Sequence, residues 1–212
     1  MSIGNSTSNK TQSADKAENT LLHLFSSADC TEYFQNLSKI TGFDLCVYNE
    51  DVSPILDFNA SPICKLLKSN PSGSLNCPES CRNSILNYLK SDDPAIFKCS
   101  CKVINFAIPV NYLKEKAVII GRNGFSSYED FLEFMNIARK NNILEIPVKT
   151  PLDFVDENYI KSISLYIQRA IGYILNNLQD KHRLVEKLGR FSSLVDFNLL
   201  NKISGDITSG HR

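Results

Sequence analysis

Cysteine is the residue type in this sequence with the greatest capacity for chemistry. The 212 residues include seven cysteines, and five of them fall within one stretch: Cys64, Cys77, Cys81, Cys99 and Cys101. The first residues lack the apolar core of a secretory signal, so we expect reduced thiols rather than disulfides. Clustered cysteines in such a chain are typical of metal or redox chemistry. Cys30 and Cys46, by contrast, are spaced like ordinary core residues.

Four of the clustered cysteines form two closely spaced pairs. Cys77 and Cys81 lie four residues apart at the start of a predicted helix, so they share one helix face. Cys99 and Cys101 lie two apart in a predicted strand, which places them on one side, roughly 6–7 Å apart. These four thiols are candidate ligands for zinc or an iron-sulfur cluster, and Cys64 is a spare ligand. Two alternatives stay open, because buried cysteines are common core residues and because a redox pair would use the same thiols.

Other catalytic chemistry finds little support. The three histidines, His23, His182 and His211, do not form a recognisable Cys–His or Ser–His pair. The segment Gly121–Gly124 (GRNG) is too short for a phosphate-binding loop, so we interpret it as a turn after a buried strand. Arg122 could project from that strand end toward an anionic ligand. We therefore expect a protein that is not an enzyme.

Charge and hydropathy restrict the class of partner. Lys plus Arg total 23 and Asp plus Glu total 23, which gives a formal net charge of zero. Proteins built around nucleic acid carry a basic excess, so we expect no direct contact with nucleic acid. No apolar run approaches the roughly 18–20 residues that span a bilayer. The expectation is a cytoplasmic protein without a membrane segment.

The elements that would position the cysteines can be read from the apolar pattern. Residues 1–18 are polar and aperiodic and are predicted to be disordered. A helical pattern then runs from Thr20 to Gly42 and is followed by these predicted elements: strands at 43–48 and 52–56 (an edge strand, because of Pro54), helices at 62–67 and from Cys77, strands at 95–103, 106–110 and 117–120, and a helix at 128–138. This order predicts an α+β fold, an antiparallel sheet with helices over one face.

The last predicted element is a long helix over residues 158–190. Its seam positions alternate in steps of three and four: Ile160, Ser164, Ile167, Ile171, Ile174, Leu178, Lys181, Val185 and Leu188. This spacing is typical of a two-stranded coiled coil, which predicts a homodimer through the C-terminal helix. The alternative is a helix that packs back on its own domain. Residues 191–212 are predicted to be a tail without an output domain.

The middle of the chain resembles the PocR ligand-binding domain of bacterial signalling proteins. The resemblance rests on an ordered series of segments from about residue 22 to residue 175: TEYFQNLSKITGFDLCVYNED, PICKLLKSNPSGSLNCPESCRNSI, AIFKCSCKVINFAIPV, AVIIGRN and ILEIPV. Cys64, Cys77 and Cys99 occupy positions where the family has cysteines. The resemblance implies a PAS-like fold that senses small hydrocarbon derivatives upstream of a signalling output.

The chain departs from the family pattern at three points. The family often has Cys-His-x-Gly at residues 99–102, an acidic residue at Cys81 and Gly-Gln at residues 121–122.

From the resemblance and the long helix together, we expect residues 19–157 to form a sensory domain that signals through the C-terminal helix to an output module or partner protein. A small organic ligand would contact Cys64, Phe106, Ile120 and Arg122. The alternative is a redox sensor in which zinc or an iron-sulfur cluster is held by Cys77, Cys81, Cys99 and Cys101.

Overall fold

The structure, a computed structural model, describes residues 20–58, 63–65, 77–141, 143 and 154–209, without the side chains of residues 78 and 191–209. The chain divides into two compact units, Met1–Tyr166 and Ile167–Arg212. The disorder predicted for residues 1–18 lies outside the described residues, and so does the segment ILEIPV apart from Ile143. Of the helix predicted at 62–67, residues 63–65 are described, and they are helical.

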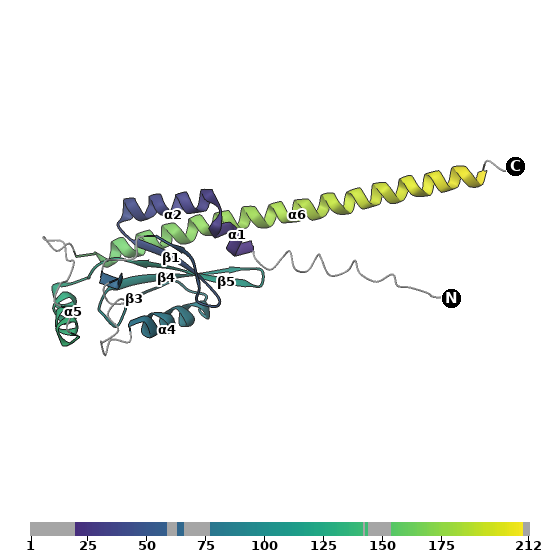
Figure 1. The fold of residues 1–212 in the computed structure, drawn as a ribbon. Coiled ribbons are helices and arrows are strands. Elements are labelled where there is room, and N and C mark those ends of the chain that lie inside the picture. The colour runs from purple at the N-terminus through teal and green to yellow at the C-terminus, as the bar shows by residue number, and fades with distance from the viewer. Residues whose placement is uncertain (1–19, 59–62, 66–76, 142, 144–153, 210–212) are drawn as a thin grey trace, which may run out of the picture. The chain divides into compact units, whose positions relative to one another are not determined.

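The first unit is built on a five-stranded antiparallel sheet (Figure 1). Its strands are β1 (Asp44–Asn49), β2 (Pro54–Asp57), β3 (Ala95–Lys98), β4 (Ile104–Tyr112) and β5 (Glu115–Arg122). They pair in the order β2-β1-β5-β4-β3, so the strand that contains Pro54 lies at an edge, as predicted. The predicted PAS-like α+β class, with flanking helices and a long C-terminal helix, is confirmed.

Helices cover both faces of this sheet, where the sequence predicts cover on one. Figure 1 shows α2 (Ala28–Thr41) and α4 (Cys77–Leu89) on opposite sides of the strands. On the α4 side, Ile85 and Leu89 pack against alternate strand residues, including Cys46 and Ile120. The physical reason lies in β5, where consecutive residues from Ala117 to Arg122 are buried. A strand that is buried at consecutive positions needs cover on both faces.

The helical stretch predicted up to Gly42 is two helices, α1 (Thr20–Ser26) and α2. Ser27 separates them, because its extended backbone and side-chain oxygen cap α2 by accepting a hydrogen bond from the Cys30 N–H. Gly42 ends α2 in the left-handed conformation, with φ of 71°, and its N–H donates to the Ser38 carbonyl. The predicted helix end is therefore correct, and the internal break is a capping feature.

The C-terminal helix, α6 (Glu157–Ser209), starts near the predicted residue and continues past the predicted end. Residues 191–209 are helical, so α6 runs through most of the segment that is predicted to be a tail without an output domain. A single glycine in a helix, here Gly189, costs only about 1 kcal/mol relative to alanine, which is too little to end a helix by itself. No helix in the described part of the chain is both long and apolar enough to cross a membrane.

The predicted seam of α6 differs between its two ends. Ile160 and Ser164 are 0% and 8% exposed. Just before them, Tyr159 donates a 3.4 Å hydrogen bond to the Thr41 carbonyl, so the start of α6 is held to its own unit. Val185 and Leu188, at the other end, are each 62% exposed. Ile160 and Ser164 are thus already buried, and dimerisation through exposed seam positions such as Val185 and Leu188 stays a prediction.

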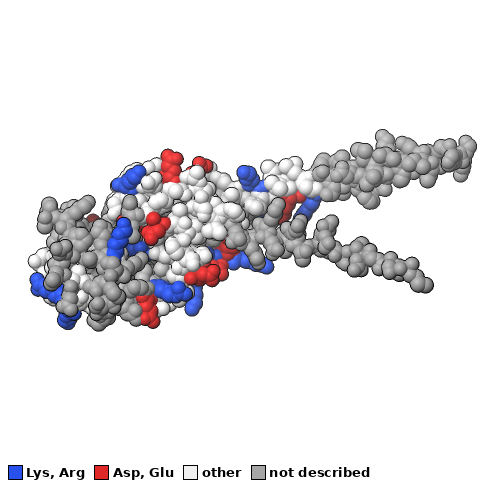
Figure 2. All heavy atoms as spheres, viewed as in Figure 1, with Lys and Arg blue, Asp and Glu red and all other residues white. Residues whose placement is uncertain are grey.

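Charged side chains are spread over the surface of the molecule. On the face drawn in Figure 2, Lys and Arg side chains are interspersed with Asp and Glu side chains. Among the described residues on that face, neither sign gathers into one continuous patch. The mixed surface agrees with the formal net charge of zero.

Candidate functional site

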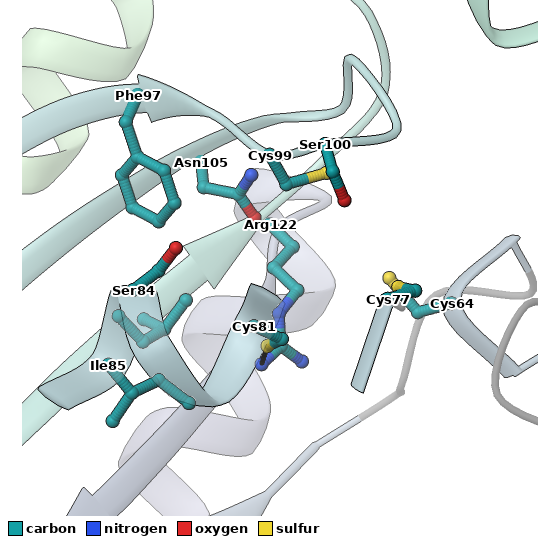
Figure 3. A pocket seen from close by; sticks show the side chains of 11 residues that line it. Cys64, Cys77, Cys81, Ser84, Ile85, Phe97, Cys99, Ser100, Asn105 and Arg122 are labelled. Atoms are coloured by element: carbon teal, nitrogen blue, oxygen red, sulfur yellow. Dashed lines mark hydrogen bonds between the residues drawn. The ribbon is translucent and has the colours of Figure 1, made fainter. Parts of the chain in front are cut away.

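A cavity opens between α4 and the sheet of the first unit (Figure 3). The cavity volume open to the centre of a water molecule is about 30 Å³, and the space between its walls reaches about 500 Å³ only when the solvent at its mouth is counted. Its walls are formed by Cys64, Cys77, Cys81, Ser84, Ile85, Phe97, Cys99, Ser100, Asn105, Ile120 and Arg122. The structure therefore brings together three residues predicted for the ligand, Cys64, Ile120 and Arg122. Three of the predicted metal ligands, namely Cys77, Cys81 and Cys99, line the same cavity.

Helix and strand periodicity explain which side chains reach the cavity. On α4, Cys77, Cys81 and Ser84 follow steps of four and three, so they share a helix face. On β5, Ile120 and Arg122 lie two residues apart and therefore point to the same side of the sheet. Phe97 of β3 and Asn105 of β4 complete the strand wall. Five lining residues were not predicted from the sequence: Ser84, Ile85, Phe97, Ser100 and Asn105.

Phe106 does not line this cavity, which corrects the prediction that it forms a wall. In the pairing of β4 with β5, Phe106 lies opposite Gly121, so it shares the face that Ile120 and Arg122 do not use. Its ring packs against Phe43, with the ring centroids 5.3 Å apart. Phe106 is fully buried on that side of the sheet.

The segment with Cys99 and Cys101 is a tight turn rather than the predicted strand. β3 ends at Lys98, the Lys102 N–H donates to the Cys99 carbonyl at 2.9 Å, and the Cys99 N–H donates to the Val103 carbonyl at 3.0 Å. Lys102 adopts a φ of 62°, which reverses the chain into β4. The turn brings the Cys101 thiol within hydrogen-bonding reach of both Cys77 and Cys99.

The environment of Cys99 favours its thiolate. The Cys101 thiol donates a hydrogen bond that, against the opposing effect of burial, helps lower the pKa of Cys99 to about 6. The backbone N–H groups of Cys101 and Val103 and the Asn105 side chain act in the same direction. The pKa of Cys101 is raised, first by its hydrogen bonds with Cys77 and Cys99 and then by burial. The arrangement therefore favours the thiolate on Cys99 and the protonated thiol on Cys101.

Cys77 and Cys101 also belong to a hydrophobic cluster with Val103, Phe125 and Phe134. Helix α5 (Tyr128–Lys140) contributes Phe134 to this cluster. Within the described parts of the chain, no three His, Cys, Asp or Glu side chains are arranged so that they could hold a metal ion. The core-packing alternative thus has direct structural support for these two cysteines.

We predict that Cys99 is alkylated by iodoacetamide with a rate midpoint near pH 6 and a plateau above about pH 7. Below pH 6 the thiol is protonated and unreactive. For an unperturbed cysteine, the alkylation rate would keep rising with pH up to its pKa near 8.5. Cys101→Ala should move the midpoint to higher pH, because it removes the hydrogen bond that lowers the pKa of Cys99 most. Cys101→Ser, which keeps a hydroxyl donor, is the matched control. Mass spectrometry of the peptide that contains residue 99 gives the rates, and a wild-type midpoint at or above 8.5 would refute the assignment.

Arg122 is the charged group of the cavity wall, and it is 3% exposed. Its Nη1 donates to Cys46 Sγ at 3.3 Å, and its Nη2 donates to Tyr48 Oη at 2.7 Å and to Cys81 Sγ at 3.8 Å. The guanidinium carbon also lies 5.8 Å from the centroid of the Tyr48 ring. The part of the cavity wall that the structure describes is thus mainly apolar and sulfur-lined, and Arg122 is its fixed cation.

Comparison with known proteins agrees with this architecture. The family described as "Sensory domain found in PocR" matches residues 23–177, which is more than half of the chain. Regulatory protein PocR of Salmonella typhimurium is 33% identical over 79 residues, which are 36% of this chain and 25% of that protein. The matched region thus spans about a quarter of that relative's length. No solved structure matches. The chain belongs to the PocR sensory-domain family.

Proposed function

We propose that this sensory domain binds a small organic molecule in the cavity between α4 and the sheet. The observation that carries the proposal is the cavity itself, which gathers Cys64, Ile120 and Arg122 with three further thiols. Small-molecule sites are concave and mostly apolar, with a few polar groups that fix the orientation of the ligand. Here Ile85, Phe97 and Ile120 supply apolar wall, and Asn105 and Arg122 supply the polar groups.

We further propose that the bound state is transmitted through α6. Cavity residues Ile120 and Arg122 flank Gly121, whose paired residue on β4 is Phe106. The Phe106 ring contacts Phe43, and the Phe43 ring lies 6.2 Å from that of Tyr159 near the start of α6. This chain of packed rings supports a route from the cavity through the sheet to the helix. A ligand that binds one arrangement of these rings better would shift the equilibrium toward it. We also propose that the chain forms a homodimer along the exposed part of the seam. This dimer would present the signal to an output module or partner protein.

Filling the cavity should abolish binding without unfolding the domain. Ser84→Phe places a ring in the cavity from α4, where Ser84 is only half-buried. A compound at about 100 times its Kd should raise the Tm of the unaltered chain by roughly 5–10 °C, because binding to the native state adds about 2.7 kcal/mol. The same compound should leave the Tm of Ser84→Phe unchanged. The measurement is a thermal-shift screen of short alcohols, amides and carboxylates.

Asn83→Phe is the matched control for this substitution. Asn83 neighbours Ser84 on α4, but its side chain is exposed and does not line the cavity. This variant should respond to each compound like the unaltered chain. If Ser84→Phe keeps the full response to every active compound, the ligand binds elsewhere and the proposal fails.

A cysteine-ligated metal is a second candidate function. The observation that supports it is that Cys101 lies within hydrogen-bonding reach of Cys77 and Cys99, so these three thiols would have to rearrange around a metal, because the described side chains do not form a metal site as they stand. The fourth, Cys81, contacts Arg122 instead. Elemental analysis of protein purified without oxygen separates the two candidates. About one zinc per chain, or iron with sulfide, that is lost on Cys99→Ser with Cys101→Ser would favour a metal sensor. Unchanged metal content in that double variant would exclude these two cysteines as ligands.

A further inference from the structure

Arg122 is a buried cation, and none of its three hydrogen-bond partners, Cys46, Tyr48 and Cys81, is a carboxylate. Burial raises the pKa of Cys46 to about 12, and burial also raises the pKa of Tyr48. Both groups therefore keep their protons at neutral pH. The only carboxylate in this chain of hydrogen bonds is that of Asp57, which is exposed and accepts from Cys46 Sγ at 3.0 Å rather than from Arg122. An arginine in a protein stays protonated, so its charge persists in the cavity wall.

Arg122 takes part in none of the ion pairs of the described residues, although Asp44 lies opposite it in the pairing of β1 with β5. The ion pairs of the described chain involve the cations of Lys98, Lys102, Arg183 and Arg190. A buried charge is costly to maintain unless it is paired. The hydrogen bonds of Arg122 occupy three of the five N–H groups of a guanidinium, and one of these three is a long contact to sulfur at 3.8 Å. The guanidinium therefore lines the cavity with spare donors and without an ion pair to a described carboxylate.

We propose that the ligand of this cavity is a small organic carboxylate whose carboxylate group pairs with Arg122. This inference rests on the proposed small-molecule function and names the class of ligand. Planar carboxylates match the fork geometry of a guanidinium, and hydrogen bonds between charged partners are about twice as strong as neutral ones. The apolar part of the ligand would lie against Ile85, Phe97 and Ile120, which line the same cavity.

The cavity wall favours a single negative charge over a multiply charged anion. Among the eleven described residues that line it, Arg122 is the one with a cationic side chain. A phosphate would bring nearly two negative charges into a site with one positive charge and apolar or sulfur neighbours. One charge on the ligand balances one charge on Arg122, which leaves the pair neutral.

The test compares acids with their neutral isosteres on the unaltered chain. Isothermal titration calorimetry at pH 7.5 and constant ionic strength would measure Kd for 3-methylbutanoate and benzoate and for 3-methylbutanamide and benzamide. Each acid should bind about tenfold or more tightly than its amide, because a hydrogen bond to a charged group is worth that factor or more. In Arg122→Gln the acid should lose this advantage, and in Arg122→Lys part of it should remain.

The outcomes separate this inference from the function on which it rests. Amides that bind as tightly as acids in the unaltered chain, and lose binding in Ser84→Phe, would overturn the carboxylate assignment and leave small-molecule binding in place. If neither series binds at millimolar concentration, the carboxylate assignment falls. If, in addition, the thermal-shift screen finds no compound that distinguishes Ser84→Phe from Asn83→Phe, the proposed function falls with it. If Arg122→Gln does not fold, Arg122→Lys and the acid–amide comparison on the unaltered chain still test whether a carboxylate pairs with Arg122.

Discussion

Replacement of Gly121 with alanine is expected to destabilise the protein by about 3 kcal/mol or to prevent it from folding. A Cβ built at Gly121 would lie 2.1 Å from two ring carbons of Phe106 and 2.7 Å from a third. The Phe106 ring is fully buried and packs against Phe43, so it cannot rotate away into solvent. Overpacking of this kind typically costs about 1–3 kcal/mol, and the severe overlap here puts the expected value at the upper end or above.

The matched control is the same substitution in an unconstrained glycine. Gly172 lies within α6, and a Cβ there would meet nothing within 4 Å. Gly172→Ala should leave stability unchanged or raise it by up to about 1 kcal/mol, because alanine is the better helix former. Phe106→Leu in the Gly121→Ala background should recover part of the loss. Urea denaturation gives the free energy of unfolding, and a Gly121→Ala protein as stable as the unaltered chain would show that Phe106 does not constrain residue 121.

Phe134→Ala is the second substitution with a large expected effect. It should lower the free energy of unfolding by about 3–5 kcal/mol. Phe134 is fully buried, and its ring centroid lies 5.2 Å from that of Phe125. The cavity left by the ring would open the cluster that also buries Cys77 and Cys101. Both thiols should therefore become more accessible to a maleimide reagent under native conditions. The measurement combines urea denaturation with mass spectrometry of the labelled cysteines.

Leu132→Ala provides the comparison on the same helix. Leu132 is 44% exposed, so its truncation should cost less than about 1 kcal/mol and leave the labelling of Cys77 and Cys101 unchanged. If Phe134→Ala and Leu132→Ala lowered the free energy of unfolding equally, this would contradict the view that Phe134 of α5 keeps the cysteine cluster buried.

Local signals in the sequence located most elements of this fold. Cysteine at residue 77, followed by proline, marked the start of α4 correctly, and Gly42 marked the end of α2. Pro54 placed β2 at an edge of the sheet. These features act through backbone geometry within a few residues, so they can be read without knowledge of the fold.

Features that depend on strand pairing could not be read in this way. The predicted strands contained Phe106 and Ile120, but only the pairing of Phe106 with Gly121 shows that these two side chains face opposite sides of the sheet. The turn at Cys99 depends on Lys102, a non-glycine residue with positive φ, which local sequence rarely indicates.

The chemistry of the site was partly visible in the sequence. Arg122 and the clustered cysteines stood out by residue type alone. The partners of Arg122 did not, because Cys46 and Tyr48 lie 76 and 74 residues away in the sequence and reach it only through the pairing of β1 with β5. The same tertiary arrangement leaves Arg122 outside the ion pairs of the described residues, which the sequence does not show.

The central claim is that the cavity between α4 and the sheet is the ligand site. The most direct measurement is a two-dimensional ¹⁵N–¹H NMR titration of the unaltered chain with benzoate and, in parallel, with benzamide. The account predicts that benzoate causes its largest shift changes at cavity residues, among them Ser84, Phe97, Ile120 and Arg122. Changes centred elsewhere, for instance on α2 across the sheet, or no change with either compound at saturating concentration, would contradict it.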